Sequence, residues 1–197
     1  MSYMNKNKLN LRSLIFEIIA LCLLLISLLL PFIEAFYTTN PYGSFKGSIV
    51  VWRGFDFIFG GATSTEVTVG VGHATTISKA PSIAIAPSLY PLIGYILLLT
   101  GFISIICVFV FEGFRKRGTC IFFDALCFSL IIAGGVLFLL SGPQIASSYF
   151  NVPLEEINSL ISESGFRLGN GILWSAICGF GSAFFAFIGG FSHVLGE

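Results

Sequence analysis

The chain has 197 residues, of which 55% are hydrophobic and only 10% are charged. Soluble domains carry about 25% charged residues, so this composition cannot cover the surface of a soluble protein of this size. Intrinsic disorder requires low hydrophobicity and high net charge, whereas the net charge here is zero. Zero net charge without a basic stripe also argues against nucleic-acid binding. The composition indicates an integral membrane protein, so we expect the lipid bilayer to be one of its partners.

Four segments are long and apolar enough to cross a bilayer, which takes about 20 apolar residues. These predicted spans are residues 13–33, 89–111, 119–140 and 171–191. The first span could also be a signal peptide, because basic residues precede it and Ala35 offers a cleavage position. Ile33 occupies a position where a small residue is preferred, and the apolar run is long for a signal core. We therefore expect the first span to be retained as a membrane helix.

The basic residues predict how the spans are oriented. Lys6, Lys8 and Arg12 precede the first span, and residues 115–117 form a basic turn between the second and third spans. Short flanks rich in Lys and Arg remain in the cytoplasm. In a plasma membrane we therefore expect residues 1–12, 112–118 and 192–197 to be cytoplasmic. Residues 34–88 and 141–170 are then expected outside.

The first outer loop is too long for a connector, and its pattern predicts β structure. Residues 47–52 form a β-branched and aromatic run, and residues 67–71 alternate between valine and other residues. Gly72 and His73 suit a turn into residues 74–78, which predicts a hairpin. Residues 54–60 are short, apolar and bracketed by glycine. We expect them to form a brief helix or turn that directs its Phe side chains toward the bilayer surface or the tops of the spans.

The second outer loop predicts a short amphipathic helix. Leu154, Ile157, Leu160 and Ile161 fall on one helical face, Pro153 suits the helix start, and Gly165 suits its C-terminal cap. A helix that packs as a lid is one interpretation, and a helix that binds a partner is the other.

One cluster of polar and aromatic residues in the outer loops is a candidate for recognition. Trp52, Arg53 and Asp56 lie close in sequence, and a local Arg–Asp contact that fixes the loop is the simpler alternative to a ligand site. The full set of candidate outer interaction residues is Trp52, Arg53, Asp56, Phe57, Leu154, Ile157 and Leu160.

Small residues at four-residue steps predict how the spans pack, because lipid offers no hydrophobic drive for helix association. The stripe on the third span is Ala125, Ser129 and Ala133, and the stripe on the fourth is Gly171, Ser175, Gly179 and Ala183. These stripes predict tight packing of the third span on the fourth. An interface between copies of the chain is the alternative use of one stripe.

Two acidic residues, Glu17 and Asp124, lie within the predicted spans. An intramembrane carboxylate is a functional candidate by default. Each lies one to two turns from the cytoplasmic end, within reach of Arg12 or of residues 115–117, so an ion pair or interfacial anchor is the simpler interpretation. Proton or cation transport is the alternative.

The sequence contains no recognisable catalytic set. None of the five cysteines lies in an outer loop or in a Cys-x-x-Cys pair, which argues against thiol–disulfide exchange. His73 and His193 are expected on opposite sides of the membrane, so they cannot share a metal ion. We expect no catalytic residues, no cofactor and no metal site, and hence no enzyme.

Four spans with a long β-rich first outer loop resemble the claudin-like tetraspan proteins in topology. The stretch Gly54-Phe55-Asp56-Phe57-Ile58-Phe59-Gly60 and the glycine-rich last span resemble uncharacterised small four-span membrane proteins of low-GC Gram-positive bacteria. That resemblance implies a bacterial membrane protein and assigns no activity. Claudins carry two cysteines in the first outer loop, which has none here, so their barrier function is not carried over.

The sequence therefore predicts an all-α membrane four-helix bundle with a small extracellular β-sheet cap. The leading function is a non-enzymatic scaffold or accessory subunit whose cap binds a protein partner or assembles with itself. The first alternative is a small homo-oligomeric channel or the membrane subunit of a transporter. A membrane enzyme acting on lipid is the second, and it would need clustered acidic or histidine residues at one interface.

Overall fold

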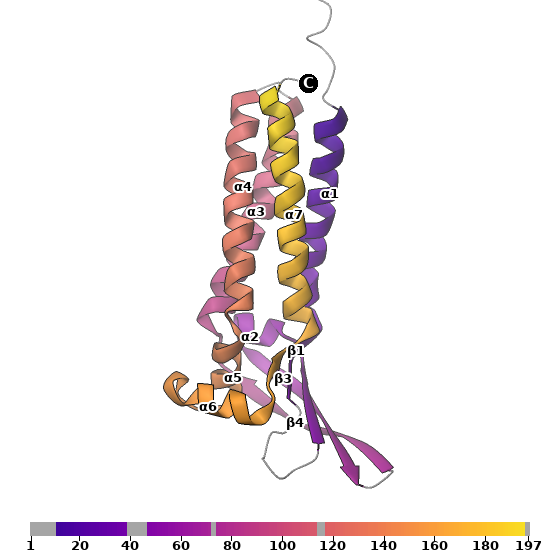
Figure 1. The fold of residues 1–197 in the computed structure, drawn as a ribbon, viewed down its shortest axis with the longest axis vertical. Coiled ribbons are helices and arrows are strands. Elements are labelled where there is room, and N and C mark those ends of the chain that lie inside the picture. Colours follow the sequence, from indigo (N-terminus) through magenta and orange to yellow (C-terminus); the bar gives the residue numbers. More distant parts are fainter. Residues whose placement is uncertain (1–10, 39–46, 72–73, 114–116, 196–197) are drawn as a thin grey trace, which may run out of the picture.

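Four long helices stand side by side, and a sheet with three short helices lies at one end of them in the computed structural model (Figure 1). The structure describes residues 11–38, 47–71, 74–113 and 117–195. We call the four long helices the bundle. We call the described residues 34–88 and 141–169 the cap. Residue 11 and residue 195 both lie at the end of the bundle away from the cap (Figure 1).

The bundle helices are α1 (Leu11–Leu29), α3 (Leu89–Gly113), α4 (Arg117–Leu139) and α7 (Asn170–Leu195). They largely coincide with apolar segments of 20 to 23 residues, the first of which runs on to Phe32, so by length and composition this is a multi-pass membrane protein. A short 3-10 turn, η1 (Leu30–Phe32), ends the first of them at Pro31. Pro31 has no backbone N–H, which suits the end of the regular helix.

α7 lies between α1 and α4, and α3 packs on α4 at the other side of the bundle. The interior is filled by apolar side chains, among them Leu98, Ile105, Ile131 and Phe138. Large apolar side chains such as Leu25 and Phe184 are exposed on the outside of the bundle. An apolar outside is what a bundle in lipid requires, because the surrounding solvent is hydrocarbon.

Serine hydroxyls join α1 to α7 along their whole length. They donate to backbone carbonyls of the facing helix: Ser13 to Gly189 (3.1 Å), Ser182 to Ala20 (2.7 Å), Ser27 to Ser175 (2.7 Å) and Ser175 to Ser27 (2.6 Å). We call these contacts the serine ladder. On each helix its positions recur every seven residues, which is about two turns and therefore one face. The ladder fixes the antiparallel register of the first and last spans.

α4 packs closely on α7, as the sequence predicted for the third and fourth spans, but the expected stripe Ala125, Ser129 and Ala133 is exposed and does not fill this interface. α4 instead meets its neighbours through two adjacent glycines. A methyl group added at Gly134 would lie 2.8 Å from the carbonyl oxygen of Gly94 on α3, and one added at Gly135 would lie 2.7 Å from the Phe180 ring on α7. These glycines allow the neighbouring helices to approach α4 more closely than alanine does. The glycine face therefore forms the interface, and the alanine stripe lies on the outside of the bundle.

The small-residue stripe on the fourth span contacts mainly the first span rather than the third. Ser175 belongs to the serine ladder, and Gly171 lies against the backbone where α1 ends. Gly179 lies nearer the centre of the bundle, where an added methyl group would meet Leu98, Ser27 and Ile131 at 3.5 to 3.6 Å. Ala183 is fully buried.

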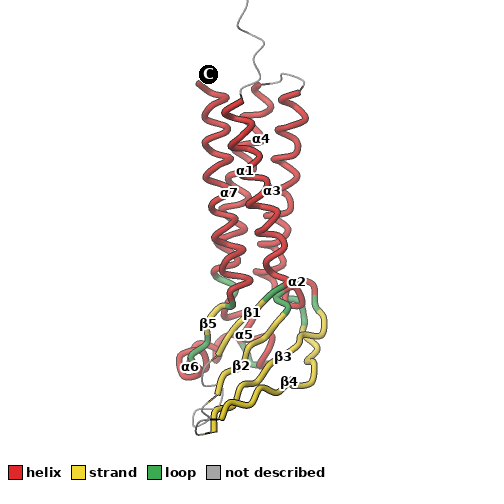
Figure 2. Tube along the Cα trace, turned by 90° about the vertical axis from the view of Figure 1, so that its right-hand side faces the viewer, coloured by secondary structure: helices red, strands yellow, loops and turns green. Residues whose placement is uncertain are grey.

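The cap contains one antiparallel sheet with strand order β4-β3-β2-β1-β5, and Figure 2 shows its strands side by side. Its strands are β1 (Glu34–Thr38), β2 (Gly47–Trp52), β3 (Gly61–Val71), β4 (Ala74–Ile85) and β5 (Arg167–Leu168). The strand at 47–52 and the following hairpin agree with the sequence patterns. The hairpin is longer than its valine alternation indicates, and its expected turn at Gly72 and His73 lies outside the described residues.

The inner face of the sheet is covered by short helices. Phe36 of β1 stands at the centre of this small core, where its ring meets Tyr149 (centroids 4.8 Å apart), Phe166 (5.0 Å) and Phe57 (6.2 Å). These rings come from α5 (Gly142–Phe150), the segment before β5, and α2 (Phe55–Phe59). A third helix, α6 (Leu154–Ser164), lies beside α5 and ends at Gly165, whose φ is 62°. The short α2 and α6 match the sequence expectation, whereas α5, β1 and β5 were missed.

The α1–α7 pair continues directly into the sheet as the β1–β5 pair. The backbone N–H of Gly169 donates to the carbonyl of Ala35 (2.9 Å), and the Asn170 side-chain amide donates to the Glu34 carboxylate (3.0 Å). A methyl group at Gly171 would lie only 2.6 Å from the Glu34 carbonyl oxygen and 2.7 Å from that of Leu30. Cap and bundle are therefore joined by close backbone packing rather than by a loose linker.

This close packing predicts that Gly171→Ala lowers the free energy of unfolding by about 1–3 kcal/mol, the usual cost of overpacking. Reversible unfolding of the purified protein in mixed SDS and mild-detergent micelles measures the change. Gly118→Ala is the matched control, because Gly118 is also the second residue of a bundle helix and has nothing within 4 Å of an added methyl group. That variant should gain up to about 1 kcal/mol from helix propensity. Equal effects of the two variants would contradict the described junction.

Candidate functional site

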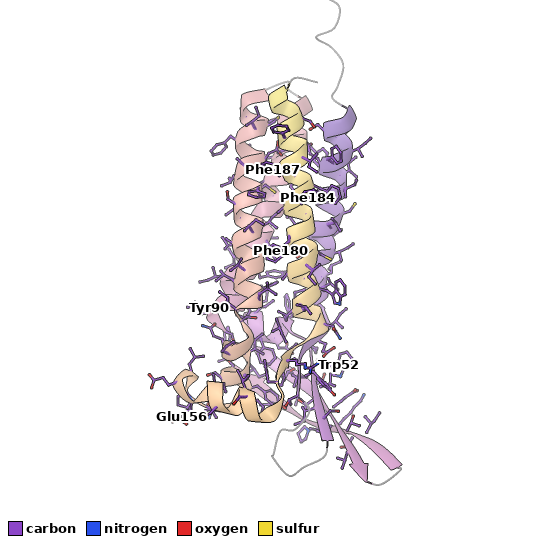
Figure 3. The ribbon with its side chains drawn as sticks, in the orientation of Figure 1. Trp52, Tyr90, Glu156, Phe180, Phe184 and Phe187 are labelled. Atoms are coloured by element: carbon purple, nitrogen blue, oxygen red, sulfur yellow. The ribbon has the colours of Figure 1, made fainter. Side chains whose placement is uncertain are left out.

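Arg53 and Asp56 sit where the bundle meets the cap, close to Trp52, which Figure 3 labels. Arg53 has a left-handed backbone (φ 64°), and its N–H donates to the carbonyl of Ile33 at 2.6 Å. The Arg53 Nε lies 3.5 Å from Asp56 Oδ2; the arginine side chain is 61% exposed and the aspartate side chain only 7% exposed. This is the local Arg–Asp contact expected as the simpler alternative, and it ties β2 and α2 to the end of α1.

Burial raises the pKa of Asp56 above its ordinary value, and the neighbouring Arg53 guanidinium opposes this by lowering that pKa. Desolvation is the larger of the two effects. The carboxylate therefore serves as a partly compensated buried charge that holds the loop, in a position where an outside ligand has little access.

Of the candidate interaction residues Phe57 and Trp52 at this junction, only Trp52 is partly exposed. Phe57 is fully buried in the small core of the cap, so its expected role in outer contacts is corrected to core packing. Trp52 is half-buried, and within the described residues its indole N–H has no hydrogen-bond partner. A buried donor left without a partner costs about 1–3 kcal/mol, so packing must hold Trp52 in place.

The candidate interaction residues on the amphipathic helix α6 differ in their burial. Ile157 is fully buried, so it packs against the cap and is not a contact for a partner. Leu154 is 49% exposed, although the sequence pattern placed it on the same face as Ile157. The side chain of Leu160 lies outside the described part of the chain. Figure 3 shows Glu156 on this helix, at the side of the cap.

The most accessible apolar part of the cap is the β4 edge of the sheet. β4 is the last strand in the sheet order, and among the described residues no strand pairs with its free side. Ile77 is 67% exposed, and Ile83, Lys79 and Pro81 are exposed as well. The sequence pattern extended this strand only to residue 78, because Pro81 interrupts the β signal. Proline is tolerated at an edge strand, where its missing N–H costs no ladder bond.

Both intramembrane acids lie toward the same end of the bundle, away from the cap, as the sequence indicated, and both lie beside α7, which the sequence did not predict. Glu17 of α1 and Asp124 of α4 are both buried. A methyl group added at Gly189 would lie 3.2 Å from Glu17 Cγ, and one added at Gly190 would lie 2.8 Å from Asp124 Cβ. Adjacent glycines of α7 thus place one carboxylate on each side of the helix. The Ser13 hydroxyl lies 2.8 Å from Glu17 Oε1 and 3.1 Å from the Gly189 carbonyl oxygen, so these two acceptors share its one proton.

The side chains of Arg12 and residues 115–117, which the sequence offers as partners of these acids, lie outside the described residues. Beside Asp124, an apolar groove of about 240 Å³ opens between α4 and α7. Its walls include Phe128 of α4 and Phe187 of α7, and Figure 3 labels Phe187 on the α7 ribbon. This groove, rather than the cap junction, is the concave feature that contains a buried charged group.

Metal chemistry finds no support in the described part of the chain, where no three His, Cys, Asp or Glu side chains gather as a metal site. Comparison with models of known protein families finds no match to this chain. Comparison with curated proteins also finds none.

Asp56 yields a pH-dependent test of the cap junction. Its pKa is raised in the folded state, so the fold binds this proton more tightly than the unfolded chain does. The free energy of unfolding should fall as the pH rises from the ordinary pKa of aspartate through the raised pKa of Asp56. Asp56→Asn removes this titration, so unfolding measured in detergent across that pH range should lack the corresponding step.

Arg53→Met is the companion variant. Without the guanidinium that lowers the pKa of Asp56, the fall in stability should extend to higher pH than in the wild type. Parallel pH profiles for the wild type and Asp56→Asn would show that this carboxyl contributes nothing to the pH dependence.

Proposed function

We propose that this chain is a non-enzymatic four-span protein of the plasma membrane whose outer cap binds an extended segment of a partner protein at β4. The observation that carries the proposal is the uncovered, apolar β4 edge of a sheet that is tied firmly to the bundle. An extended peptide that adds to a sheet edge gains main-chain hydrogen bonds, and its alternate side chains supply specificity.

The register of β4 limits where such a segment can add. β4 pairs with β3 without interruption from Ala74 to Ala80, and the pairing shifts between Ala80 and Ile83, where Pro81 lies. Proline cannot donate a hydrogen bond to an added strand. The docking stretch is therefore Ala74–Ala80, about 24 Å of strand at roughly 3.4 Å per residue. Lys79 is its single charged residue.

A separate partner fits this edge better than a second copy of the chain. The strands run obliquely to the bundle axis in Figure 2. Two copies in one bilayer are related by a two-fold axis along the membrane normal. The part of the β4 direction that runs along this axis therefore points the same way in both copies. Their β4 strands would then not be antiparallel, whereas a partner segment can take the antiparallel direction freely.

The placement of the cap outside the cell rests on the charge pattern of the chain. In the sequence, Lys6 and Lys8 precede α1, Arg12 is the second residue of α1, and residues 115–117 come between the end of α3 and the body of α4. The described ends of these helices lie away from the cap (Figure 1). Segments of this kind remain in the cytoplasm, which puts β4 on the outer side.

The alternative of a channel gains less from the structure. Leu98, Ile105, Ile131 and Phe138 fill the interior of the bundle, and the ladder serines donate to backbone carbonyls. A conducting path would therefore have to lie between copies of the chain rather than inside one copy.

Site-specific photo-cross-linking tests the docking stretch. A photoreactive phenylalanine derivative replaces Ile77 or Lys79 in turn, in the cells that contain the native protein, and mass spectrometry maps the products. Because both positions lie on one face of β4, we expect cross-links to one partner segment, at partner residues two apart and in reversed order.

Leu154 on α6 is the matched control, since it is an exposed leucine of the same cap outside the sheet. The same substitution there should give no cross-link to that segment. Products that join two copies of the chain through position 77 would indicate self-assembly instead of binding to a partner protein. Products scattered over many proteins would contradict a docking edge.

A further inference from the structure

Four aromatic rings join the end of the first span, α2 and α3 at the cap end of the bundle. The Phe55 ring of α2 stacks on Phe32 of η1 with centroids 4.3 Å apart, and it lies 4.5 Å from Phe59. Phe55 and Phe59 also meet the Tyr95 ring of α3, at 6.0 and 5.4 Å. We call these four residues the aromatic patch. Phe59 is 47% exposed and Phe32 is 51% exposed, so the patch is part of the outer surface.

The short helix α2 separates its polar side from its aromatic side. Phe55 and Phe59 are four residues apart and therefore share one helical face. Asp56 is only 5% exposed, and a methyl group added at Gly61 of β3 would lie 2.6 Å from its Oδ1. The acid of α2 thus lies against the sheet of the cap, while the two outer phenylalanines lie in the patch.

The residues that the patch contacts on the spans lie within the apolar segments. Phe32 is the last residue of the segment Ser13–Phe32, and Tyr95 lies six residues inside the segment Leu89–Phe111. Glu112 is the first charged residue after that segment in the sequence. The hydrocarbon core is about 30 Å thick, and the 16 residues from Tyr95 to Phe111 span about 24 Å of helix. A core that begins at Phe111 therefore reaches past Tyr95.

Aromatic residues elsewhere on the bundle mark the same end. Trp174 of α7 is 52% exposed and Tyr90 of α3 is 37% exposed, and Figure 3 shows Tyr90 at the cap end of the bundle. Tryptophan and tyrosine are enriched where membrane meets water. Figure 2 shows α2 at this end of the bundle, beside α3. The membrane boundary expected from these two residues is thus at the end where α2 lies.

An exposed charge lies on the cap side of the patch. The Arg53 N–H donates to the carbonyl of Ile33, the residue that follows Phe32, and the Arg53 side chain is 61% exposed. A long arginine side chain can keep its guanidinium in the headgroup layer while apolar neighbours enter hydrocarbon. The order of apolar rings followed by an exposed charge is the one expected at a membrane boundary.

We propose that α2 is an interfacial membrane helix whose Phe55 and Phe59 contact the lipid hydrocarbon of the leaflet on the cap side. Lipid fits the patch because the patch is continuous with the outward surface of α3, where Ile96 and Leu99 are exposed. An interfacial helix buries its apolar face about 5–10 Å into the boundary layer. This contact holds the cap at a fixed height on the membrane, whether or not β4 binds a partner.

Photo-cross-linking to lipid tests the contact directly. p-Benzoylphenylalanine replaces Phe59 in the full-length protein, which is reconstituted into phosphatidylcholine vesicles and irradiated. Mass spectrometry is expected to show one added lipid, bonded through an acyl chain. The same substitution at Ile103, an exposed residue in the middle of α3, is the positive control. Leu154 of α6 is the matched negative control, because it is 49% exposed in the cap, and it should give no lipid product.

A pair of near-isosteric variants separates lipid contact from ring packing. Phe59→Leu and Phe59→Asn both remove the ring, but only the second brings a polar amide into hydrocarbon, where it finds no hydrogen-bond partner. In phosphatidylcholine bilayer discs, Phe59→Asn should unfold several degrees below Phe59→Leu. Leu154→Asn makes the same leucine-to-asparagine change at a similarly exposed cap position, and it should differ less from the wild type.

Four results would overturn the proposal. Absence of a lipid product at position 59, with a product at 103, would show that lipid does not reach α2. A bond only to the headgroup would place α2 above the hydrocarbon. A product that joins two copies through position 59 would assign the patch to a second copy of the chain. Equal unfolding of Phe59→Leu and Phe59→Asn would show that this position needs only the packing of its ring.

Discussion

The serine ladder between the first and last spans is the constraint on which the rest of the structure depends. In lipid, apolar side chains gain nothing by leaving one hydrocarbon for another, so helix association needs close packing and hydrogen bonds. Ser27 and Ser175 exchange hydrogen bonds with each other's carbonyls near the cap, and Ser182 and Ser13 repeat the contact at two further levels toward the other end of the bundle. With three levels engaged, α1 and α7 cannot slide by a turn without breaking all of them.

That register determines what lies at each end of the bundle. At one end it brings Gly169 and Asn170 against β1, so the helix pair passes into the sheet without a break. At the other end it brings Gly189 opposite Glu17, and the next residue, Gly190, then faces Asp124. The position of the cap and the convergence of the two acids are therefore two results of one helix pairing.

Local patterns in the sequence predicted the elements well where one residue period dominates. The hairpin and the short helix at 154–164 carry such a period, whereas the four spans and the strand at 47–52 were predicted from their long apolar or β-branched runs. α5 and β1 carry weaker signals: α5 has nine residues with mixed polarity, and β1 has five that continue an apolar span. β5 has only two residues, too few for any periodicity.

The packing of the spans was harder to predict, because several faces of one helix carry small residues. Ala125, Ser129 and Ala133 form a regular stripe yet remain exposed, since Gly134 and Gly135 permit closer contact. The ladder was partly hidden for another reason: at Ala20 and Gly189 the acceptor is a backbone carbonyl, which no side-chain pattern reveals. Sequence reasoning found both acids but had no means of placing them beside the same helix.

The serine ladder also determines the order in which parts of the chain can fold. Its hydrogen bonds join residues 148 to 176 positions apart in the sequence, whereas α3 and α4 are neighbours in the sequence and pack on each other. Contacts between distant residues form late because a long loop must close first. The α3–α4 hairpin can assemble as soon as both helices have been synthesised, but the β1–β5 pair and the α1–α7 pair must wait for the last span. α7, which is synthesised after the other three bundle helices, is thus the helix that closes both the membrane bundle and the cap.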